Sequence, residues 1–275
     1  MLQIAVLALV QGITEFLPIS SSGHLVLTPI LFGWPDQGIL IDVAVHVGTL
    51  VAVVIYFGRD VLLMLRGVGS GSAVAASDSE RARGGRPIEG RRLLIYVIVA
   101  TIPVIAVGLA ISVFDLLDGM RNITVIGWTM LVFGIILWLA DRYGTHAAGL
   151  GDMRLIDALL IGLAQVLALI PGTSRSGITM SMGRALGFKR DEAARFSLLL
   201  AIPTIAAAGL LATKEIIELG ELSIGRDAII GAILAGLSAW LAIWAMMGWL
   251  RRASFTPFVI YRVILGLILL AIAYS

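Results

Sequence analysis

The chain has no cysteine and little charge. Of its 275 residues, 14% are Asp, Glu, Lys or Arg and 59% are hydrophobic, with a mean hydropathy of +1.00. A soluble domain carries about 25% charged and about 45–50% apolar residues. The absence of cysteine excludes disulfides and thiolate metal sites. The shortage of charge excludes a soluble enzyme, a nucleic-acid binder and a disordered protein, so the composition predicts a polytopic membrane protein.

Charge is also missing from the beginning of the chain. No charged side chain precedes Glu15, and no Lys or Arg precedes Arg59. The apolar N-terminus therefore lacks the basic region of a signal peptide, and it has no small-residue cleavage site. We expect residues 1–17 to belong to the fold.

A helix needs about 20 mostly apolar residues to cross a bilayer. Six stretches are long enough: 39–57, 93–114, 123–140, 195–213, 228–250 and 258–274. Two further apolar stretches, 1–33 and 155–188, are interrupted by polar segments at 18–23 and 171–177. The parts on either side of each interruption are short for complete spans. They predict two re-entrant hairpins whose polar loops lie at membrane depth.

The two interruptions resemble each other. The first reads Pro-Ile-Ser-Ser-Ser-Gly and the second Pro-Gly-Thr-Ser-Arg-Ser-Gly, and a glutamine precedes each, Gln11 or Gln165. Three complete spans follow each hairpin, so the expected fold is a single all-α membrane domain over 1–275, with repeat one at 1–140 and repeat two at 155–275, offset by about 153 residues. Because three is odd, the second repeat must begin from the opposite side of the membrane. Each half of this inverted-topology repeat is a re-entrant broken-helix hairpin plus three transmembrane helices, and such repeats place a site near the bilayer midplane.

Lys and Arg are unevenly distributed between the connections. Of 20 basic residues, 14 lie in 58–92, 141–154, 187–195 and 251–256, whereas 3 lie in 114–122 and 214–227. The positive-inside rule places the first set in the cytoplasm and both termini outside. The Gly-, Ser- and Arg-rich stretch over about 67–90 is predicted to be a mobile cytoplasmic loop.

Both polar loops are rich in hydroxyl groups and glycine, and each is followed by a helix. The N-terminus of a helix offers free N–H groups and the positive end of the dipole, which favour anions. Two such ends near the midplane predict an anion-binding cradle, with hydroxyl groups from Ser20, Ser21, Ser22, Thr173, Ser174 and Ser176. The alternative is that these side chains only cap the broken helices.

Arg175 and Glu15 are charges in otherwise apolar segments. A guanidinium there is costly unless it faces a partner or a cavity, and its planar fork suits phosphate oxygens. Glu15 stands four residues after Gln11, on the same helix face. Glu15 would act as a general base, or it would ligate a hard divalent cation together with phosphate oxygens. A structural ion pair with Arg175 is compatible with either role.

Two histidines and one further arginine complete the candidates. His24 follows the Ser-rich loop and is a candidate proton donor or nucleophile, whereas His46 lies near the outer end of its span and is a weaker candidate. We expect Arg184, near the cytoplasmic end, to snorkel toward the membrane surface.

These segments carry a family resemblance. The run from Gln11 to His24 resembles the (E/Q)xxxE motif and Ser-rich extension of the bacterial undecaprenyl-diphosphatase (bacitracin-resistance) family, and the run from Pro171 to Thr179 resembles its PGxSRSxxT motif. The match continues through residues 46–49 and 190–197, so it covers most of the chain.

The resemblance implies an integral membrane hydrolase that converts undecaprenyl diphosphate to undecaprenyl phosphate, the lipid carrier of peptidoglycan synthesis. It further implies a role in bacitracin tolerance through the lipid that bacitracin binds, an outward-facing site in the bacterial inner membrane, and stimulation by Mg²⁺ or Ca²⁺. The family's catalytic roles fall on Glu15, Ser21, His24 and Arg175, and Gln11 and Thr179 join the diphosphate-binding residues. Gln11 stands where the motif also allows Glu, so one carboxylate fewer is present and the ion is expected to be weakly held at Glu15. The nucleophile stays open between Ser21, His24 and water.

A transporter or flippase of a polyprenyl phosphate lipid is the alternative function. Inverted repeats with broken helices are typical of transporters, and an anion cradle would also bind a headgroup that is moved rather than cleaved. A transporter needs no general base, so Glu15 discriminates between the two. A homo-oligomer is compatible with either function, and no nucleic-acid partner is expected.

Overall fold

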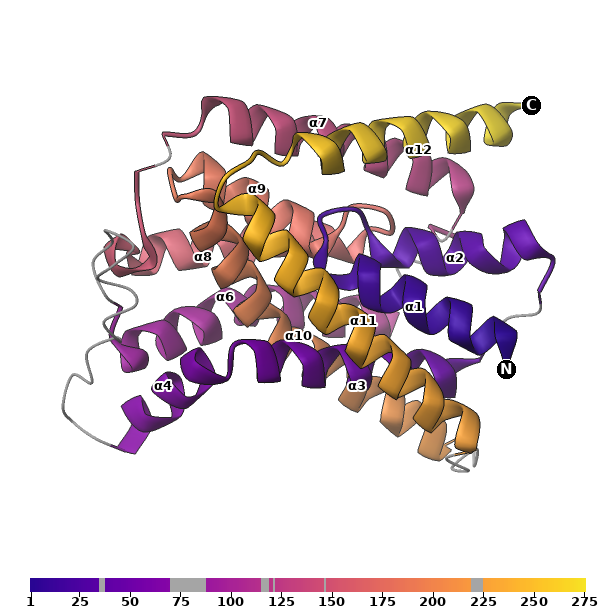
Figure 1. Ribbon diagram of the computed structural model, residues 1–275, viewed down its shortest axis with the longest axis horizontal. Coiled ribbons are helices and arrows are strands. Elements are labelled where there is room, and N and C mark those ends of the chain that lie inside the picture. Colours follow the sequence, from indigo (N-terminus) through magenta and orange to yellow (C-terminus); the bar gives the residue numbers. More distant parts are fainter. Residues whose placement is uncertain (35–37, 70–87, 115–118, 121, 146, 219–224) are drawn as a thin grey trace.

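The computed structural model describes residues 1–34, 38–69, 88–114, 119–120, 122–145, 147–218 and 225–275, which contain helices and no strand. Six helices are long and apolar enough to cross a membrane (Figure 1). They are α3 (Ile39–Tyr56), α6 (Gly90–Phe114), α7 (Ile123–Tyr143), α10 (Arg190–Glu218), α11 (Arg226–Leu250) and α12 (Thr256–Tyr274). The six predicted spans are confirmed, with ends that differ by a few residues.

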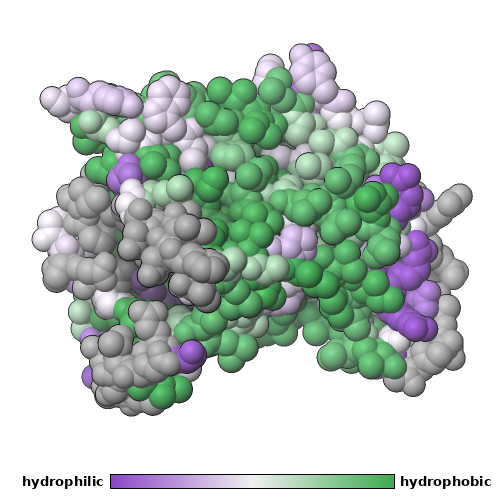
Figure 2. Space-filling view, turned by 180° about the vertical axis from the view of Figure 1, so that it is seen from behind, coloured by the Kyte–Doolittle hydropathy of each residue, from purple (hydrophilic) through white to green (hydrophobic). Residues whose placement is uncertain are grey.

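The outer surface of these helices is apolar. Only 28–39% of each spanning window is buried inside the protein, and large side chains such as Ile55, Leu237 and Trp244 are more than half exposed. Figure 2 shows apolar atoms across the middle of the molecule and hydrophilic atoms toward the two ends of its long axis. An apolar surface of this extent requires hydrocarbon around it rather than water. The protein is a multi-pass α-helical membrane protein.

Both interrupted stretches form helical hairpins. In the first, α1 (Leu2–Phe16) and α2 (Ser21–Phe32) flank a short loop, and in the second, α8 (Leu155–Val166), a single 3₁₀ turn and a loop lead into α9 (Arg175–Ala185). Figure 1 shows the α1–α2 hairpin on the side of the two chain termini and the α8–α9 hairpin reaching in from the opposite side. An inverted repeat would produce this arrangement, and the insertion of the two halves from opposite membrane surfaces stays a prediction.

The same helix contacts occur in both halves of the chain when α1, α3, α6 and α7 are matched with α8, α10, α11 and α12 in that order. Helix α1 packs on α11 as α8 packs on α6, α3 packs on α11 as α10 packs on α6, and α7 packs on α12. Glycines permit the closest approaches, since a Cβ on Gly48 would lie 2.0 Å from the Ala232 carbonyl oxygen and one on Gly162 would lie 2.5 Å from that of Ala100. Small residues allow such backbone contacts between membrane helices.

The connection between α3 and α6 contains a helix that the sequence did not predict. Helix α4 (Gly58–Gly69) follows α3 directly and packs on α6, and its Asp60 forms an ion pair with Arg195 of α10. The predicted mobile loop over 67–90 overlaps the end of α4 and the beginning of α6, and its middle part, 70–87, lies outside the described residues.

The prediction that Arg184 snorkels to the membrane surface is wrong. Its side chain is fully buried, its Nε donates a hydrogen bond to Asp141 Oδ1 at 3.0 Å, and Nη1 donates to the Phe188 carbonyl oxygen. Asp141 also accepts a hydrogen bond from Arg190 Nε at 2.7 Å. The charge of Arg184 is therefore neutralised inside the protein by Asp141 of α7, and the chain after α9 turns at Gly187 (φ +89°) and brings the Phe188 carbonyl group to the same guanidinium.

Candidate active site

The two polar loops have the same local structure. Ser20 and Ser174 both adopt a left-handed conformation, with φ of 76° and 71°. Each begins the helix that follows, because its Oγ accepts a hydrogen bond from the backbone N–H three residues later, of Gly23 at 3.4 Å or Gly177 at 3.1 Å. These two serines stand 154 positions apart, close to the offset of about 153 residues that the sequence predicts for the repeat. A serine in this conformation is strained. It turns the chain sharply in each hairpin, so that the N-termini of α2 and α9 lie beside the two loops.

The loops also contact each other directly. Ser176 Oγ donates to the Leu17 carbonyl oxygen at 2.9 Å, and the Gly172 N–H lies 3.5 Å from Ser22 Oγ. These contacts join positions about 150 residues apart in the chain. The predicted meeting of the two loops is thus present in the structure.

Glu15 is the centre of the site. Its Oε2 accepts hydrogen bonds from Ser21 Oγ at 2.6 Å and from Gln11 Nε2 at 2.9 Å, and its Oε1 lies 3.4 Å from Arg175 Nη2. Ser21 and Arg175 are the first residues of α2 and α9. The side chains of Glu15 and Arg175 are 7% and 12% exposed. The carboxylate therefore joins a hydroxyl group, a guanidinium and two helix N-termini in a nearly water-free environment.

His24 and His46 differ in how their rings are held. The Nδ1 of His24 donates to the Ser20 carbonyl oxygen at 2.6 Å, while Nε2 bonds to the hydroxyl group of Tyr261, whose ring stacks on the imidazole at 5.6 Å. His46 Nδ1 donates to the Asp42 carbonyl oxygen at 2.7 Å, and its Nε2 lies 4.0 Å from Glu15 Oε2. Both ring nitrogens of His24 are thus engaged, and His46 faces the centre more directly than its sequence position suggested.

The other predicted hydroxyl groups fall into two groups. Ser20, Ser174 and Ser176 cap or join the loops, and Thr179 Oγ1 contacts the Arg175 carbonyl oxygen at 2.8 Å and Ser197 Oγ at 2.7 Å. Ser22 is exposed at the loop surface. Thr173 Oγ1 is fully buried and has no hydrogen-bond partner within the described part of the chain. Ser22 and Thr173 are therefore the hydroxyl groups best placed, besides Ser21, to receive a ligand.

The sequence analysis missed Arg262. This residue of α12 is fully buried, and its guanidinium donates to five carbonyl oxygens, those of Pro18, Thr129, Met130, Gly172 and Thr173, at 2.9–3.3 Å. Three of these carbonyls belong to the two loops. The available signal was a charge inside the apolar stretch 258–274, the same signal that identified Arg175.

The site contains few metal ligands. In the described ranges, no cluster of three or more His, Cys, Asp or Glu side chains could together hold a metal ion. Glu15 supplies one carboxylate, and the buried Oε1 of Gln11 has no hydrogen-bond partner there. One carboxylate with an amide oxygen fits a hard cation such as Mg²⁺ that takes its remaining ligands from water and phosphate, not a closed protein cage.

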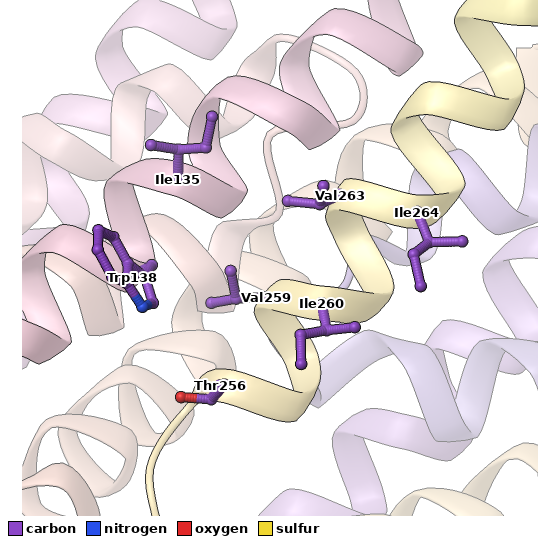
Figure 3. Close-up of a pocket in the computed structure, with 7 residues that line it drawn as sticks. All are labelled: Ile135, Trp138, Thr256, Val259, Ile260, Val263 and Ile264. Atoms are coloured by element: carbon purple, nitrogen blue, oxygen red, sulfur yellow. The ribbon is translucent and has the colours of Figure 1, made fainter.

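A separate groove of about 310 Å³ lies between α7 and α12 (Figure 3). Its lining is Ile135, Trp138, Thr256, Val259, Ile260, Val263 and Ile264, with no charged side chain. A phosphate group would find only the Thr256 hydroxyl group there, so the groove does not replace the loop site.

The fold and the site define an integral membrane protein whose enclosed polar centre brings together a hydroxyl group, a carboxylate and a guanidinium group. Residues 4–268 match the family described as Bacitracin resistance protein BacA, and the chain belongs to this family.

Curated relatives cover nearly the whole chain. The undecaprenyl-diphosphatase of Ruegeria pomeroyi is 53% identical over 269 residues, and that of Roseobacter denitrificans is 51% identical, each alignment covering 98% of this chain and 97% of the relative. Undecaprenyl-diphosphatase 1 of Rhodospirillum rubrum is 46% identical and covers the whole chain.

Proposed function

We propose that the protein hydrolyses undecaprenyl diphosphate to undecaprenyl phosphate and inorganic phosphate, as the names of its relatives indicate. The observation that carries the proposal is the hydrogen bond of 2.6 Å from Ser21 to Glu15, beside the guanidinium of Arg175. A site that only binds an anion needs hydrogen-bond donors, whereas this site also has a carboxylate, Glu15, that accepts a hydrogen bond from the hydroxyl group of Ser21. That pairing is the arrangement of an activated nucleophile.

In the proposed first step, Ser21 Oγ attacks the terminal phosphorus and Glu15 accepts the hydroxyl proton. The bond between that phosphorus and the bridging oxygen breaks, and undecaprenyl phosphate leaves. Water then attacks the phosphorus of the phosphoserine, and the bond between that phosphorus and Ser21 Oγ breaks. The proton on Glu15 returns to Ser21 Oγ, and inorganic phosphate departs with the oxygen and both protons of the water. Geometry favours Ser21 over His24 as the nucleophile, because both His24 ring nitrogens already have partners.

Charge on the phosphoryl oxygens has to be stabilised during both steps. Arg175 and the N-termini of α2 and α9 supply preorganised donors in a site shielded from water, where such donors act most strongly. When bound, Mg²⁺ or Ca²⁺ would neutralise phosphate charge, held by Glu15 and the Gln11 amide oxygen together with the substrate. Thr173 and Ser22 would bind diphosphate oxygens.

We further propose that the protein lies in the bacterial inner membrane with its site open to the outer side and its isoprenoid substrate tail among the apolar helices. This placement rests on the asymmetric distribution of Lys and Arg. Products on that side would return the lipid carrier to peptidoglycan synthesis and would reduce the diphosphate lipid that bacitracin binds.

The test is phosphate release from a long-chain isoprenoid diphosphate by purified protein in detergent, with and without Mg²⁺ or Ca²⁺. Arg175→Ala should abolish release, whereas Arg252→Ala, which removes an exposed arginine in the turn after α11, should preserve it. Hairpins that reach the centre from opposite sides also fit a flippase. Binding of the lipid diphosphate without phosphate release would favour that function and contradict hydrolysis.

A further inference from the structure

Among the residues that the structure describes, Arg262 is a buried arginine that lacks an acidic partner. Arg175, Arg184 and Arg195 each form an ion pair, with Glu15, Asp141 and Asp60 respectively. Within the part of the chain that the structure describes, Arg262 forms none, and its five hydrogen bonds all end on backbone carbonyl oxygens. A buried charge without a counter-charge is costly, so a cation retained here requires a reason.

Two glycines make room for this side chain. A Cβ on Gly134 of α7 would lie 3.1 Å from Arg262 Cβ, and a Cβ on Gly177 of α9 would lie 2.8 Å from Arg262 Nη1. Gly177 belongs to the first turn of α9, whose N-terminus faces the site. The guanidinium therefore lies against the first turn of α9 and the carbonyl groups of the two loops.

The carbonyl partners show what the guanidinium holds in place. Pro18 belongs to the first loop, and Gly172 and Thr173 belong to the second. A single planar group thus ties the two loops to each other and to α7 through Thr129 and Met130. The relative position of Ser21 and Arg175 depends on these two loops.

We propose that Arg262 is a positioning residue with a second role, as the buried positive charge whose counter-ion is the substrate diphosphate. Glu15 and Arg175 neutralise each other, so Arg262 leaves the centre with one positive charge before substrate binds. An anion in the cradle compensates that charge without touching the guanidinium. This inference rests on the proposed function, because it assigns Arg262 a role in binding the diphosphate group of the proposed substrate.

The charge and the geometry can be separated by substitution. Arg262→Lys keeps the charge but cannot hold five carbonyl groups, so we expect pyrophosphate affinity close to that of the wild type and a large fall in kcat. Arg262→Gln removes the charge, and we expect its pyrophosphate affinity to fall by roughly tenfold or more, since a unit charge acts strongly in a medium of low dielectric. The loss should be greater for inorganic pyrophosphate than for inorganic phosphate, which carries less charge.

Affinities would be measured by calorimetric titration of the purified proteins with each anion, and folding by thermal unfolding and size-exclusion chromatography. A folded Arg262→Gln protein that binds pyrophosphate as the wild type does would overturn the proposed electrostatic role. Titration needs no turnover. A wild type that binds pyrophosphate but releases no phosphate from lipid diphosphate would therefore count against hydrolysis, not against Arg262.

Gly134→Ala tests the positioning role without removing any charge. The three atoms nearest to the added methyl group, at 3.1–3.8 Å, all belong to Arg262, whereas a Cβ on Gly248 of α11 would meet nothing within 4 Å. We expect Gly134→Ala to lower kcat severalfold while Gly248→Ala leaves it unchanged. Equal kcat values for both variants and the wild type would overturn the positioning role, including in the case where Arg262→Gln does not fold.

Discussion

Glu15 lies within reach of four groups, Gln11, Ser21, His46 and Arg175, so its substitution affects both the chemistry and the electrostatics of the centre. Glu15→Gln keeps the size of the side chain but removes the base that accepts the Ser21 proton. We expect kcat to fall by a factor of about 10²–10⁴, the usual contribution of general acid–base catalysis. Steady-state phosphate release from lipid diphosphate in detergent measures this directly.

Glu89→Gln is the matched control for Glu15→Gln. Glu89 stands before α6, and the hydrogen bond recorded for it, with the N–H of Leu93, uses its backbone carbonyl group. Its variant should therefore retain full activity. Hydrolysis by Glu15→Gln at the wild-type rate would contradict the assignment of Glu15 as base and would favour the flippase.

Tyr261 orients His24 through a hydrogen bond and a stacked ring. Tyr261→Phe keeps the ring but removes the hydroxyl group, so His24 Nε2 loses its partner. A net hydrogen bond is worth about 1 kcal/mol, and we expect kcat to fall roughly fivefold. In a double-mutant cycle with His24→Ala, the two effects should be non-additive. Additive losses would mean that Tyr261 acts independently of His24.

At the scale of elements, the second loop depends on Gly172. Its φ is +87°, and a Cβ there would lie 2.1 Å from Thr129 Oγ1. Gly119 has the same φ of +87°, but a Cβ there would meet nothing within 4 Å. Both substitutions by alanine carry the cost of a left-handed residue, about 1–2 kcal/mol, and only Gly172→Ala adds a steric clash next to Arg175.

We therefore expect Gly172→Ala to lower thermal stability more than Gly119→Ala and to abolish phosphate release, while Gly119→Ala remains active. Thermal unfolding in detergent and the phosphate assay give the two readings. Equal stability and activity for the two variants would show that the second loop tolerates displacement.

The helices and the breaks could be predicted because a bilayer imposes a length on apolar segments and penalises polar interruptions. Helix α4 was missed because its 12 residues are too few to cross a bilayer, so the length of apolar segments gave no signal for it. The burial of Arg184 was missed because distance along the chain from a membrane surface does not reveal Asp141, 43 positions away.

The centre of the site could be predicted only where motif residues coincide with unusual chemistry. Glu15, Ser21 and Arg175 met both conditions. Arg262 and Tyr261 lie in the last span, outside the motifs, and reach the loops only after α12 packs beside α7 and α2. His24 contacts Tyr261 across 237 positions, and Pro18 contacts Arg262 across 244 positions. Contacts this distant in sequence arise from the tertiary fold, so no local pattern could predict them.

At the scale of the whole molecule, orientation decides on which side the site is reachable. The chain contains no cysteine, so a single introduced cysteine reports its own location without a cysteine-free background. Met120 and Ser275 lie on the connection and terminus predicted to be outside, and Ala147 and Ala253 lie on connections predicted to be cytoplasmic. Each would be replaced by cysteine in turn.

A membrane-impermeant maleimide applied to intact cells should label Met120→Cys and Ser275→Cys, and it should label Ala147→Cys and Ala253→Cys only after the membrane is permeabilised. The physical reason is that 14 of the 20 basic residues lie on the connections predicted to be cytoplasmic, and basic connections resist translocation. The reverse labelling pattern would place the termini in the cytoplasm and would contradict the outward-facing site. Labelling of all four positions in intact cells would instead show that the protein inserts in two orientations. An inverted repeat with a weak charge bias permits dual insertion, whereas the strongly uneven distribution of Lys and Arg in this chain opposes it.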